Sequence, residues 1–293
     1  MKPVILITLL AVVGCNSPSR LDGTGKASAE SPPAPRVIDP RAPAISPEPS
    51  GLDRDDRLAR VERRLDKVIA TLDQALGPPE PDPGAMYAVP INEQDPIEGP
   101  RDAKVTIVEG YEFLCPYCYL VNPLVEKIRA KYPDDVRVVS KYLVIHGAPA
   151  ATAGTYACAA AKQGKFTEMR TALWDRLWKT ENGRPQAHPE QIEHLDEVAT
   201  SIGLDRARLA KDLEGCQQWL QSGQRELAAV GVNATPAFFV NGRPLRERSF
   251  EAFDRLVSEE LAKAKRSEIA AADYYQREVV GKGLKTVKSR FAE

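Results

Sequence analysis

The sequence of 293 residues has no excess of either charge, since 40 Lys and Arg residues stand against 41 Asp and Glu residues. It therefore gives no electrostatic reason to expect a nucleic-acid partner. Histidine is scarce, and none of the three stands at ligand spacing from a cysteine. A zinc site needs four Cys or His ligands at characteristic spacing, and Cys158 and Cys216 are too far apart in sequence to complete one with Cys115 and Cys118. We therefore expect no metal, and we also predict no other cofactor.

Long apolar runs are missing as well. The N-terminal run from Val4 to Val13 has ten residues and is broken only by Thr8. This run follows Lys2 and is too short for a stable membrane span, but it suits the core of a signal peptide. We therefore predict a signal peptide over residues 1–14. The mature chain would face the periplasm or extracytoplasmic space of a bacterial cell envelope, where disulfides persist.

The segment Val12-Val13-Gly14-Cys15 resembles the bacterial lipobox, in which the cysteine is lipidated and becomes the mature N-terminus. We predict that Cys15 anchors the chain to a membrane through lipid; the alternative is an ordinary cleaved signal with an incidental cysteine. The chain has five cysteines, and an odd number in a secreted protein leaves one thiol unexplained. Lipidation of Cys15 leaves two pairs among Cys115, Cys118, Cys158 and Cys216.

The segments before residue 87 differ in composition from the rest of the chain. Residues 15–50 carry seven prolines between Pro32 and Pro49, which predicts a lipidated, disordered tether. Residues 51–77 predict an amphipathic helix, because apolar side chains recur at alternating spacings of three and four. The seam, a short heptad pattern, consists of Leu58, Val61, Leu65, Val68, Leu72 and Ala75. It indicates a coiled coil that makes a homodimer through residues 52–76, or else a helix that packs on its own domain or spaces it.

Residues 87–264 predict a globular α/β domain. A β-branched strand from Lys104 to Tyr111 runs into Cys115-Pro116-Tyr117-Cys118, an apolar helical stripe follows, and Val136 to Ile145 predicts a second strand. This order is typical of a βαβ unit with parallel strands. Residues 149–230 are mostly helical in pattern. A strand at Ala237 to Val240, a turn and a helix to Lys263 complete the domain, and residues 265–293 predict a helical extension to which we assign no chemistry.

The Cys115-Pro-Tyr-Cys118 segment indicates a redox-active dithiol. A cysteine where a helix begins meets unpaired N–H groups and the positive end of the helix dipole, which favour the thiolate. Pro116 fits the first helical turn, where its missing N–H costs nothing. Cys115 is therefore the candidate nucleophile, and Cys118, one turn further in, is the candidate resolving thiol. A purely structural disulfide is the alternative.

The chain resembles the DsbA family of thiol–disulfide oxidoreductases. The resemblance rests on the segment from Ile107 to Cys118, on Gly231-Val-Asn-Ala-Thr-Pro-Ala-Phe-Phe-Val-Asn-Gly242 and on Gly99-Pro-Arg-Asp-Ala103. It implies a thioredoxin-like fold with an inserted helical domain.

The resemblance also implies residue roles. Thr235–Pro236 takes the family's cis-proline position, whose loop pairs with an extended substrate strand. We assign substrate binding to Pro116, Tyr117, Thr235 and Pro236. Glu109 matches the family's buried acid, which would exchange a proton with Cys118; an edge-facing Glu with no role is the alternative. Glu112 is expected to be a solvated surface acid near the site.

The remaining pair, Cys158 and Cys216, lies in the helical region. If their two helices pack in one bundle, the two cysteines can form a structural disulfide, which is the pairing that we predict; the resemblance agrees, because some members of this family branch carry a second disulfide in the helical domain. Two buried free thiols are the alternative.

The favoured function is an envelope enzyme that oxidises cysteine pairs in exported client proteins and is reoxidised by a membrane redox partner. A reductase or isomerase of the same fold is the first alternative. It draws support from the heptad helix, from Thr235 before the proline, and from Tyr117 where the best-known oxidases carry His. A non-catalytic peptide-binding module of the envelope is the second alternative.

Overall fold

A computed structural model of the chain describes residues 53–76 and 79–288, apart from the side chains of residues 73 and 74. Contacts within the chain divide it into two units, residues 1–56 and residues 57–293. The described part of the first unit contains only the beginning of α1 (Arg54–Leu76). The signal peptide, the lipidation of Cys15 and the Pro-rich tether all fall on residues 1–52, which lie outside the described residues. Within the described ranges, no helix is long and apolar enough to cross a membrane.

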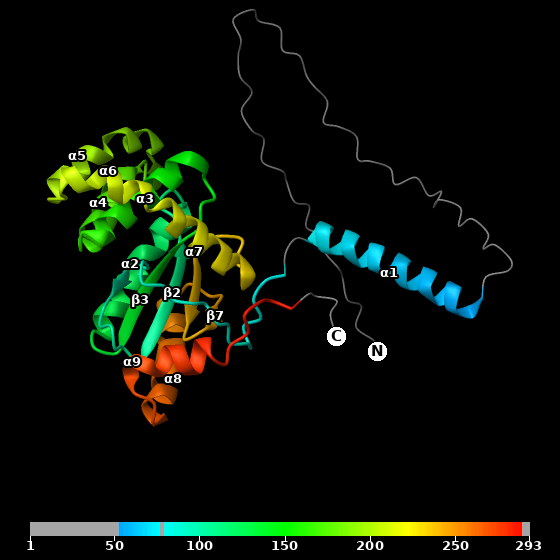
Figure 1. The fold of residues 1–293 in the computed structure, drawn as a ribbon. Helices are drawn as coiled ribbons and strands as arrows, with labels where there is room; N and C mark the ends of the chain where they lie inside the picture. The colour runs from blue at the N-terminus through cyan, green and yellow to red at the C-terminus, as the bar shows by residue number, and fades with distance from the viewer. Residues whose placement is uncertain (1–52, 77–78, 289–293) are drawn as a thin grey trace, which may run out of the picture. The chain divides into compact units, whose positions relative to one another are not determined.

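A five-stranded mixed sheet forms the centre of the second unit (Figure 1). Its strands, in spatial order, are β1 (Ile97–Glu98), β3 (Val136–Tyr142), β2 (Val105–Tyr111), β6 (Ala237–Val240) and β7 (Arg243–Leu245). β2 and β3 run parallel and are joined by α2 (Pro116–Lys131), whereas β6 pairs antiparallel with β2. All seven residues of both β2 and β3 are buried, because the sheet is covered on both faces.

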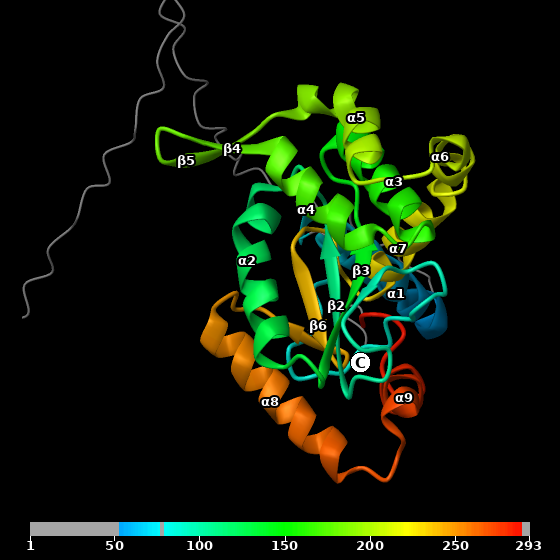
Figure 2. The same ribbon diagram turned by 90° about the vertical axis from the view of Figure 1, so that its left-hand side faces the viewer.

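Helices cover one face of the sheet and a mixture of helix and extended chain covers the other (Figure 2). On the first face, α2 and α8 (Phe250–Arg266) pack Val125 and Phe253 against Ile107. On the second face, α7 (Gln217–Ala229) and the C-terminal extension pack Leu227 and Val279 against Val108. The central strand β2 therefore lies in the interior of the domain.

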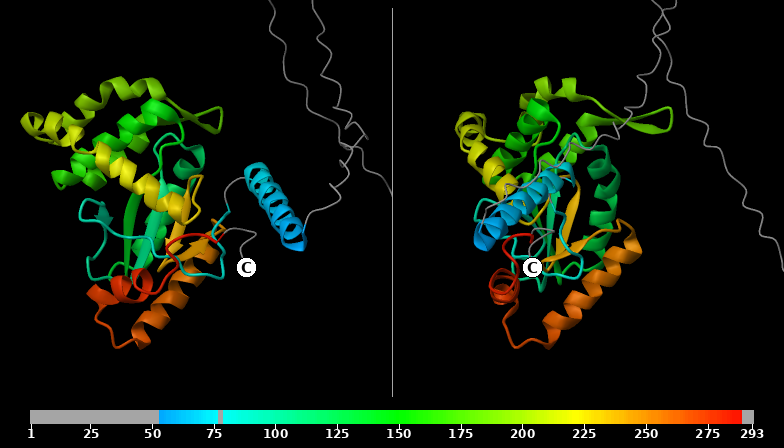
Figure 3. Two further views of the ribbon diagram at one scale, coloured as in Figure 1. Left: turned by 45° about the vertical axis from the view of Figure 1, so that its right-hand side comes forward. Right: turned by 90° about the vertical axis from the view of Figure 1, so that its right-hand side faces the viewer.

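The C-terminal extension is part of this second covering layer. It contains the short α9 (Ala271–Tyr274) and a π-helical turn, η2 (Tyr275–Val280), and then continues without helix, so it is less helical than expected. The Tyr275 hydroxyl donates to the Val89 carbonyl over 2.8 Å, and the Ala88 amide donates to the Leu284 carbonyl over 2.8 Å. Figure 3 shows this red segment beside the cyan chain that precedes β1. The extension thus shields the sheet.

The inserted region between β3 and β6 contains a β-hairpin that the helical pattern did not predict. Five helices make up most of the region: α3 (Gly147–Lys162), α4 (Phe166–Leu177), α5 (Leu195–Ser201), α6 (Arg206–Glu214) and α7. The hairpin of β4 (Trp178–Glu181) and β5 (Arg184–Ala187) follows α4, and a 3₁₀ helix, η1 (Pro189–His194), follows the hairpin. Asn182 and Gly183 both have positive φ, +50° and +73°, as a two-residue hairpin turn requires.

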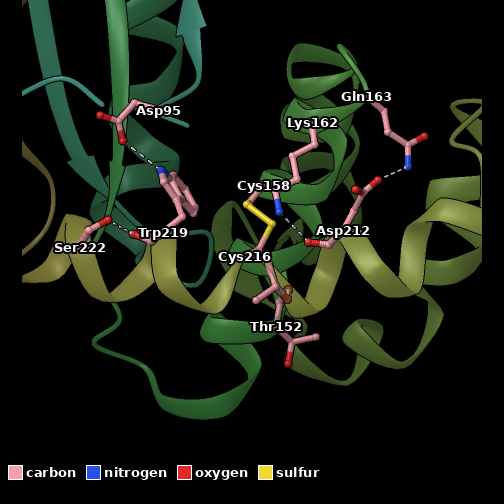
Figure 4. Close-up of a disulfide and its surroundings, with 10 residues drawn as sticks. Asp95, Thr152, Cys158, Lys162, Gln163, Asp212, Cys216, Trp219 and Ser222 are labelled. Atoms are coloured by element: carbon pink, nitrogen blue, oxygen red, sulfur yellow. Dashed lines mark hydrogen bonds between the residues drawn. A yellow bond between two sulfur atoms is a disulfide. The ribbon is translucent and has the colours of Figure 1, made fainter. Parts of the chain in front are cut away.

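A disulfide joins Cys158 of α3 to Cys216, the residue that precedes α7 (Figure 4). Both cysteines are buried, and their Cα atoms are 5.8 Å apart. In the first turn of α7, the Trp219 indole donates to the Asp95 carboxylate over 3.0 Å. Together these contacts attach α7 both to the helical region and to the segment before β1.

We expect loss of this disulfide to lower the free energy of unfolding by about 4 kcal/mol, because the bridge closes a loop of 58 residues in the unfolded chain. Urea unfolding of Cys158→Ala/Cys216→Ala measures the loss. The comparison is best made in a Cys115→Ser/Cys118→Ser background, where a reductant acts on this bridge alone and should reproduce the loss. A decrease below about 1 kcal/mol would contradict the expectation.

Candidate active site

The Cys-x-x-Cys segment lies where β2 passes into α2. Cys115 is the N-cap of α2, with extended backbone dihedrals (φ −80°, ψ 118°), and Pro116 occupies the first turn. The Tyr119 amide donates to the Cys115 carbonyl over 3.1 Å, which begins the helical ladder. The Cys115 sulfur therefore stands at the helix N-terminus, where unpaired amides and the helix dipole stabilise an anion.

The pKa values of the two active-site thiols are shifted in opposite directions. Both are free thiols, with Cys115 3% exposed and Cys118 fully buried. A hydrogen bond from the Cys118 thiol lowers the pKa of Cys115 to about 6; the amides of Tyr117 and Cys118 add to this effect, although burial opposes it. Burial raises the pKa of Cys118 well above its usual value, and the neighbouring Cys115 sulfur raises it further. At neutral pH, Cys115 is thus the thiolate and Cys118 the proton-bearing thiol.

The loop before β6 faces these sulfurs. The Thr235–Pro236 peptide bond is cis, and the Thr235 carbonyl oxygen lies 3.4 Å from the Cys115 sulfur, from which it accepts a hydrogen bond when Cys115 is protonated. The Arg248 guanidinium, which sequence reasoning did not single out, donates to the Pro236 carbonyl over 2.8 Å and so fixes the other end of this turn. Tyr117, by contrast, has 65% of its surface exposed beside the site. The structure thus brings Tyr117, Thr235 and Pro236 around Cys115.

Glu109 lies on β2 with its side chain buried, as a buried acid rather than an edge-facing one. Its Oε2 accepts from the Arg170 guanidinium over 2.9 Å. Burial raises the pKa of the Glu109 carboxyl, and the Arg170 charge acts against that rise. Sequence reasoning missed Arg170. A signal was present, because Arg170 falls on the buried stripe of α4 between Met169 and Leu173.

The expectation that Glu112 is a solvated surface acid is wrong. Its side chain is fully buried, and its Oε2 accepts from the amides of Ile145 and His146 over 2.9 and 3.2 Å. The His146 ring nitrogen Nδ1 also contacts Glu112 Oε1. Because Glu112 lies three residues before Cys115, it ties the active-site turn to the start of α3 and has a structural role there.

Other predicted residues lie away from the site or outside the described residues. Cys158 and Cys216 form their bridge within the helical region. Cys15 is not among the described residues. Within residues 53–76 and 79–288, no cluster of His, Cys, Asp or Glu side chains has an arrangement that could hold a metal ion.

The domain combines a buried dithiol at a helix N-terminus, a cis-proline loop that faces this dithiol, and a five-stranded mixed sheet. Together these features define a thioredoxin-like protein. A family model described as thioredoxin matches residues 91–259, so the chain belongs to the thioredoxin family. With its helical insertion, it has the fold of the DsbA-like thiol–disulfide oxidoreductases, and the predicted fold class is confirmed.

Solved structures share this fold, and curated relatives match part of the chain. The catalytic domain of ScsC from Proteus mirabilis is 26% identical, with a TM-score of 0.50 over 60% of this chain and 93% of that domain. BdbD from Bacillus subtilis shares the fold with a TM-score of 0.52 and 20% identity, over 61% of this chain and 98% of that one. A Na⁺/H⁺ antiporter NhaA from Herminiimonas arsenicoxydans is 37% identical over 53% of this chain. The chain spans about a quarter (23%) of the length of that relative.

In the reduced protein, we expect the ultraviolet absorbance of the Cys115 thiolate to titrate with a midpoint near pH 6, because the pKa of Cys115 is lowered to about 6. Cys118→Ala removes the main hydrogen-bond donor, so the midpoint should rise, and Cys115→Ser should abolish the transition. A wild-type midpoint near the ordinary thiol value of about 8.5 would contradict this expectation.

The same lowered pKa makes the stability of the reduced form depend on pH. The folded pKa lies below the unfolded one, so the thiolate contributes its full stability above about pH 8.5 and loses it as the pH falls through about 6. Urea unfolding of the reduced protein should show this loss, whereas Cys115→Ser should not.

Proposed function

We propose that this protein is an envelope enzyme that transfers its Cys115–Cys118 disulfide to cysteine pairs of exported client proteins. The placement of Cys115 and Cys118 at the N-terminus of α2, facing the cis Thr235–Pro236 turn, is the observation that carries the proposal, and the lowered pKa of Cys115 agrees with it. A thiolate that is stable in the reduced protein favours reduction of the enzyme's own disulfide, which makes the disulfide an oxidant. The Pro-Tyr dipeptide is compatible with this chemistry, because the stabilisation comes from Cys118 and backbone amides.

The reaction proceeds through a mixed disulfide. A client thiolate attacks the Cys115 sulfur, the bond to Cys118 breaks, and Cys118 leaves as a thiolate that takes up a proton. A second client thiolate then attacks the client sulfur of the mixed disulfide, and Cys115 leaves as a stable thiolate. The client gains a disulfide and the enzyme becomes a dithiol, from which a membrane redox partner removes two electrons.

Client binding in this proposal uses the surface around Cys115. An extended client segment would pair with the backbone of the cis-proline loop at Thr235 and Pro236. Tyr117 and Pro116 would contact it from α2, and the exposure of the Tyr117 ring supports this role. Arg248 holds the Pro236 carbonyl and thereby keeps the loop in place.

We also infer that the chain is exported and anchored at a membrane. The apolar run, the lipobox-like Cys15 and the Pro-rich segment that follows support this location. The tether would give the catalytic domain reach from a membrane surface. We attribute no transport activity to this chain, because the likeness to the antiporter covers only 23% of that protein.

A reductase or isomerase remains the second candidate, and α1 is the observation that favours it. Its heptad positions Leu58, Val61, Leu65, Val68 and Leu72 have between 42% and 58% of their surface exposed. A helix with such a seam can pair with a second copy of itself. A homodimer through residues 52–76 would place two dithiol sites in one particle.

The reduction potential of the Cys115/Cys118 couple distinguishes the two candidates. For an oxidase we expect a value close to about −120 mV, whereas a value close to about −270 mV would support a reductase. Equilibration with glutathione redox buffers measures the potential. Cys115→Ser should abolish client oxidation; a variant that keeps the biological function would instead favour a non-catalytic binding module.

Sedimentation of the full mature chain tests the dimer. We expect Leu65→Asp to convert a dimer into a monomer, because a charge within the seam must be desolvated when the helices pair. Arg63→Asp, a charge change elsewhere on the same helix, is the matched control and should stay dimeric. A wild-type protein that sediments as a monomer would exclude pairing through α1.

A further inference from the structure

The β4–β5 hairpin is fixed at its base to both sides of the active-site turn. Trp178, the first residue of β4, is 4% exposed, and its indole donates to the Phe113 carbonyl over 2.7 Å. The Trp178 ring stacks on Tyr119 of α2, with ring centroids 4.9 Å apart and an interplanar angle of 11°. Phe113 precedes Cys115 by two residues, and Tyr119 follows it by four. The two strands project from the end of α4 (Figure 2), so the hairpin is an arm held next to the redox site.

The two faces of this hairpin differ in polarity. Its register pairs Trp178 with Ala187 and Thr180 with Pro185. Residues directly opposite each other share a face, and successive residues in a strand alternate between faces. These four side chains therefore form one face, which carries no charge and which we call the uncharged face. The polar face carries Lys179, Glu181, Arg184 and Gln186.

The uncharged face is the one turned toward α2, because Trp178 belongs to it and stacks on Tyr119. Beyond Trp178 this face is open, since Thr180 and Ala187 are exposed and Pro185 is half-buried. A two-stranded hairpin is only marginally stable by itself in water. The contacts of Trp178 therefore hold the open part of the face in position.

An apolar stripe on α2 continues this surface. The members of the α2 stripe are Pro116, Tyr119, Leu120 and Pro123. Their spacing of i, i+3, i+4 and i+7 places them on one face of the helix. Pro116 and Pro123 are exposed, and Leu120 has 58% of its surface exposed. The stripe begins directly after Cys115, so it joins the redox site to the hairpin.

The cis-proline loop lies on the other side of α2. Tyr117 is two residues from Tyr119, and residues two apart in a helix point in nearly opposite directions. Tyr117 lines a small cavity together with Arg248, whose guanidinium holds the Pro236 carbonyl. The hairpin is therefore separate from the client contacts expected at Thr235 and Pro236.

Large exposed apolar side chains are concentrated on α2. Within residues 79–288, those with high exposure are Tyr117, Leu120, Ile145 and Leu284. The first two lie in the first two turns of α2. Contiguous exposed apolar surface, unlike a single exposed side chain, marks an interaction site. The α2 stripe, together with the uncharged face, has this character.

We propose that the α2 stripe and the uncharged face of the hairpin form a second client-binding surface, which binds apolar side chains of an unfolded client on the side of Cys115 away from the cis-proline loop. The inference rests on the proposed oxidation of clients and names a property of those clients. An exported chain that has not yet folded still exposes its apolar side chains. Cys115 is only 3% exposed, so the client cysteine must arrive on an extended segment, whose flanking residues then reach both sides of α2.

Peptides with one cysteine pair test this surface in the full mature chain. In three peptides of equal length, three leucines precede the pair, follow it, or are replaced by serines. Each peptide reduces the Cys115–Cys118 disulfide, and rapid acid quench measures the second-order rate constant. We expect one of the leucine peptides to react faster than the serine peptide by roughly fivefold or more, in the range of an interface contact. We call this ratio of rate constants the leucine preference.

Variants of the hairpin locate the leucine preference. Thr180→Asp and Thr180→Lys each place a charge on the uncharged face, which bound leucines would have to desolvate. Both should bring the ratio close to one. Gln186→Asp adds a charge to the polar face of the same hairpin, so this matched control should keep the preference. Thr180→Val removes a hydroxyl from the uncharged face and should increase the ratio.

Three results would overturn the proposal. They are equal rates of the leucine and serine peptides with the wild-type protein, a preference that persists in both charged Thr180 variants, and opposite effects of Thr180→Asp and Thr180→Lys, which would indicate recognition of charge. An unchanged preference with altered sedimentation of Thr180→Asp would assign the surface to a second copy of this chain and would also overturn it.

The peptide rates are independent of the direction in which electrons flow in the cell. A reduction potential typical of a reductase would therefore reject the proposed oxidase and leave the leucine preference measurable. Conversely, an oxidase potential without a leucine preference would reject only the second client-binding surface. The two failures are distinguishable.

Discussion

The antiparallel pairing of β2 with β6 is the constraint on which the active site depends. It places Gly110 opposite Ala237, and so brings the turn after β2 next to the residue that follows the cis-proline. A side chain at residue 110 would meet Leu227 of α7, since an added Cβ would lie 3.0 Å from its Cδ1. Because all of β2 is buried, its register cannot slip without moving apolar side chains to the wrong face. Cys115 and Thr235, 120 residues apart, meet as a result.

Ionisable side chains inside the domain are held by partners of opposite charge. On one side of the sheet, Arg170 pairs with Glu98 and Glu109, and the partly exposed Arg129 also pairs with Glu98. On the other side, the fully buried Lys141 of β3 pairs with Asp95 over 2.5 Å and with Glu226 of α7. Removing one member of a buried pair leaves an uncompensated charge, which is strongly destabilising. The helical insertion is thus attached to the sheet by charge as well as by apolar packing.

Much of the sheet and of the redox motif could be predicted from the sequence, because their signals are local. Each of these signals involves only neighbouring residues: the β-branched run before Cys115 indicates a strand, and Pro116 and the apolar stripe of α2 indicate a helix. The hairpin of β4 and β5 also has a local signal, Asn182-Gly183, but only Trp178 and Ala187 are apolar in its two strands, so no alternation of apolar side chains marks them as strands. There, tertiary context decided between strand and helix.

Residues whose roles depend on distant partners could not be predicted in the same way. Glu112 is buried because the start of α3, 33 residues later in the chain, places two amides and an imidazole against it. The dithiol, its order of nucleophile and resolving thiol, and the strand–helix junction that activates it could all be identified from the sequence. The cation that accompanies Glu109 became evident from the folded chain, since Arg170 reaches it from an inserted helix, 61 residues away in sequence. The redox motif depends on backbone preferences of residues that are close in sequence. The pair of Glu109 with Arg170 exists only after separate layers of the fold have packed and excluded water from the charges between them.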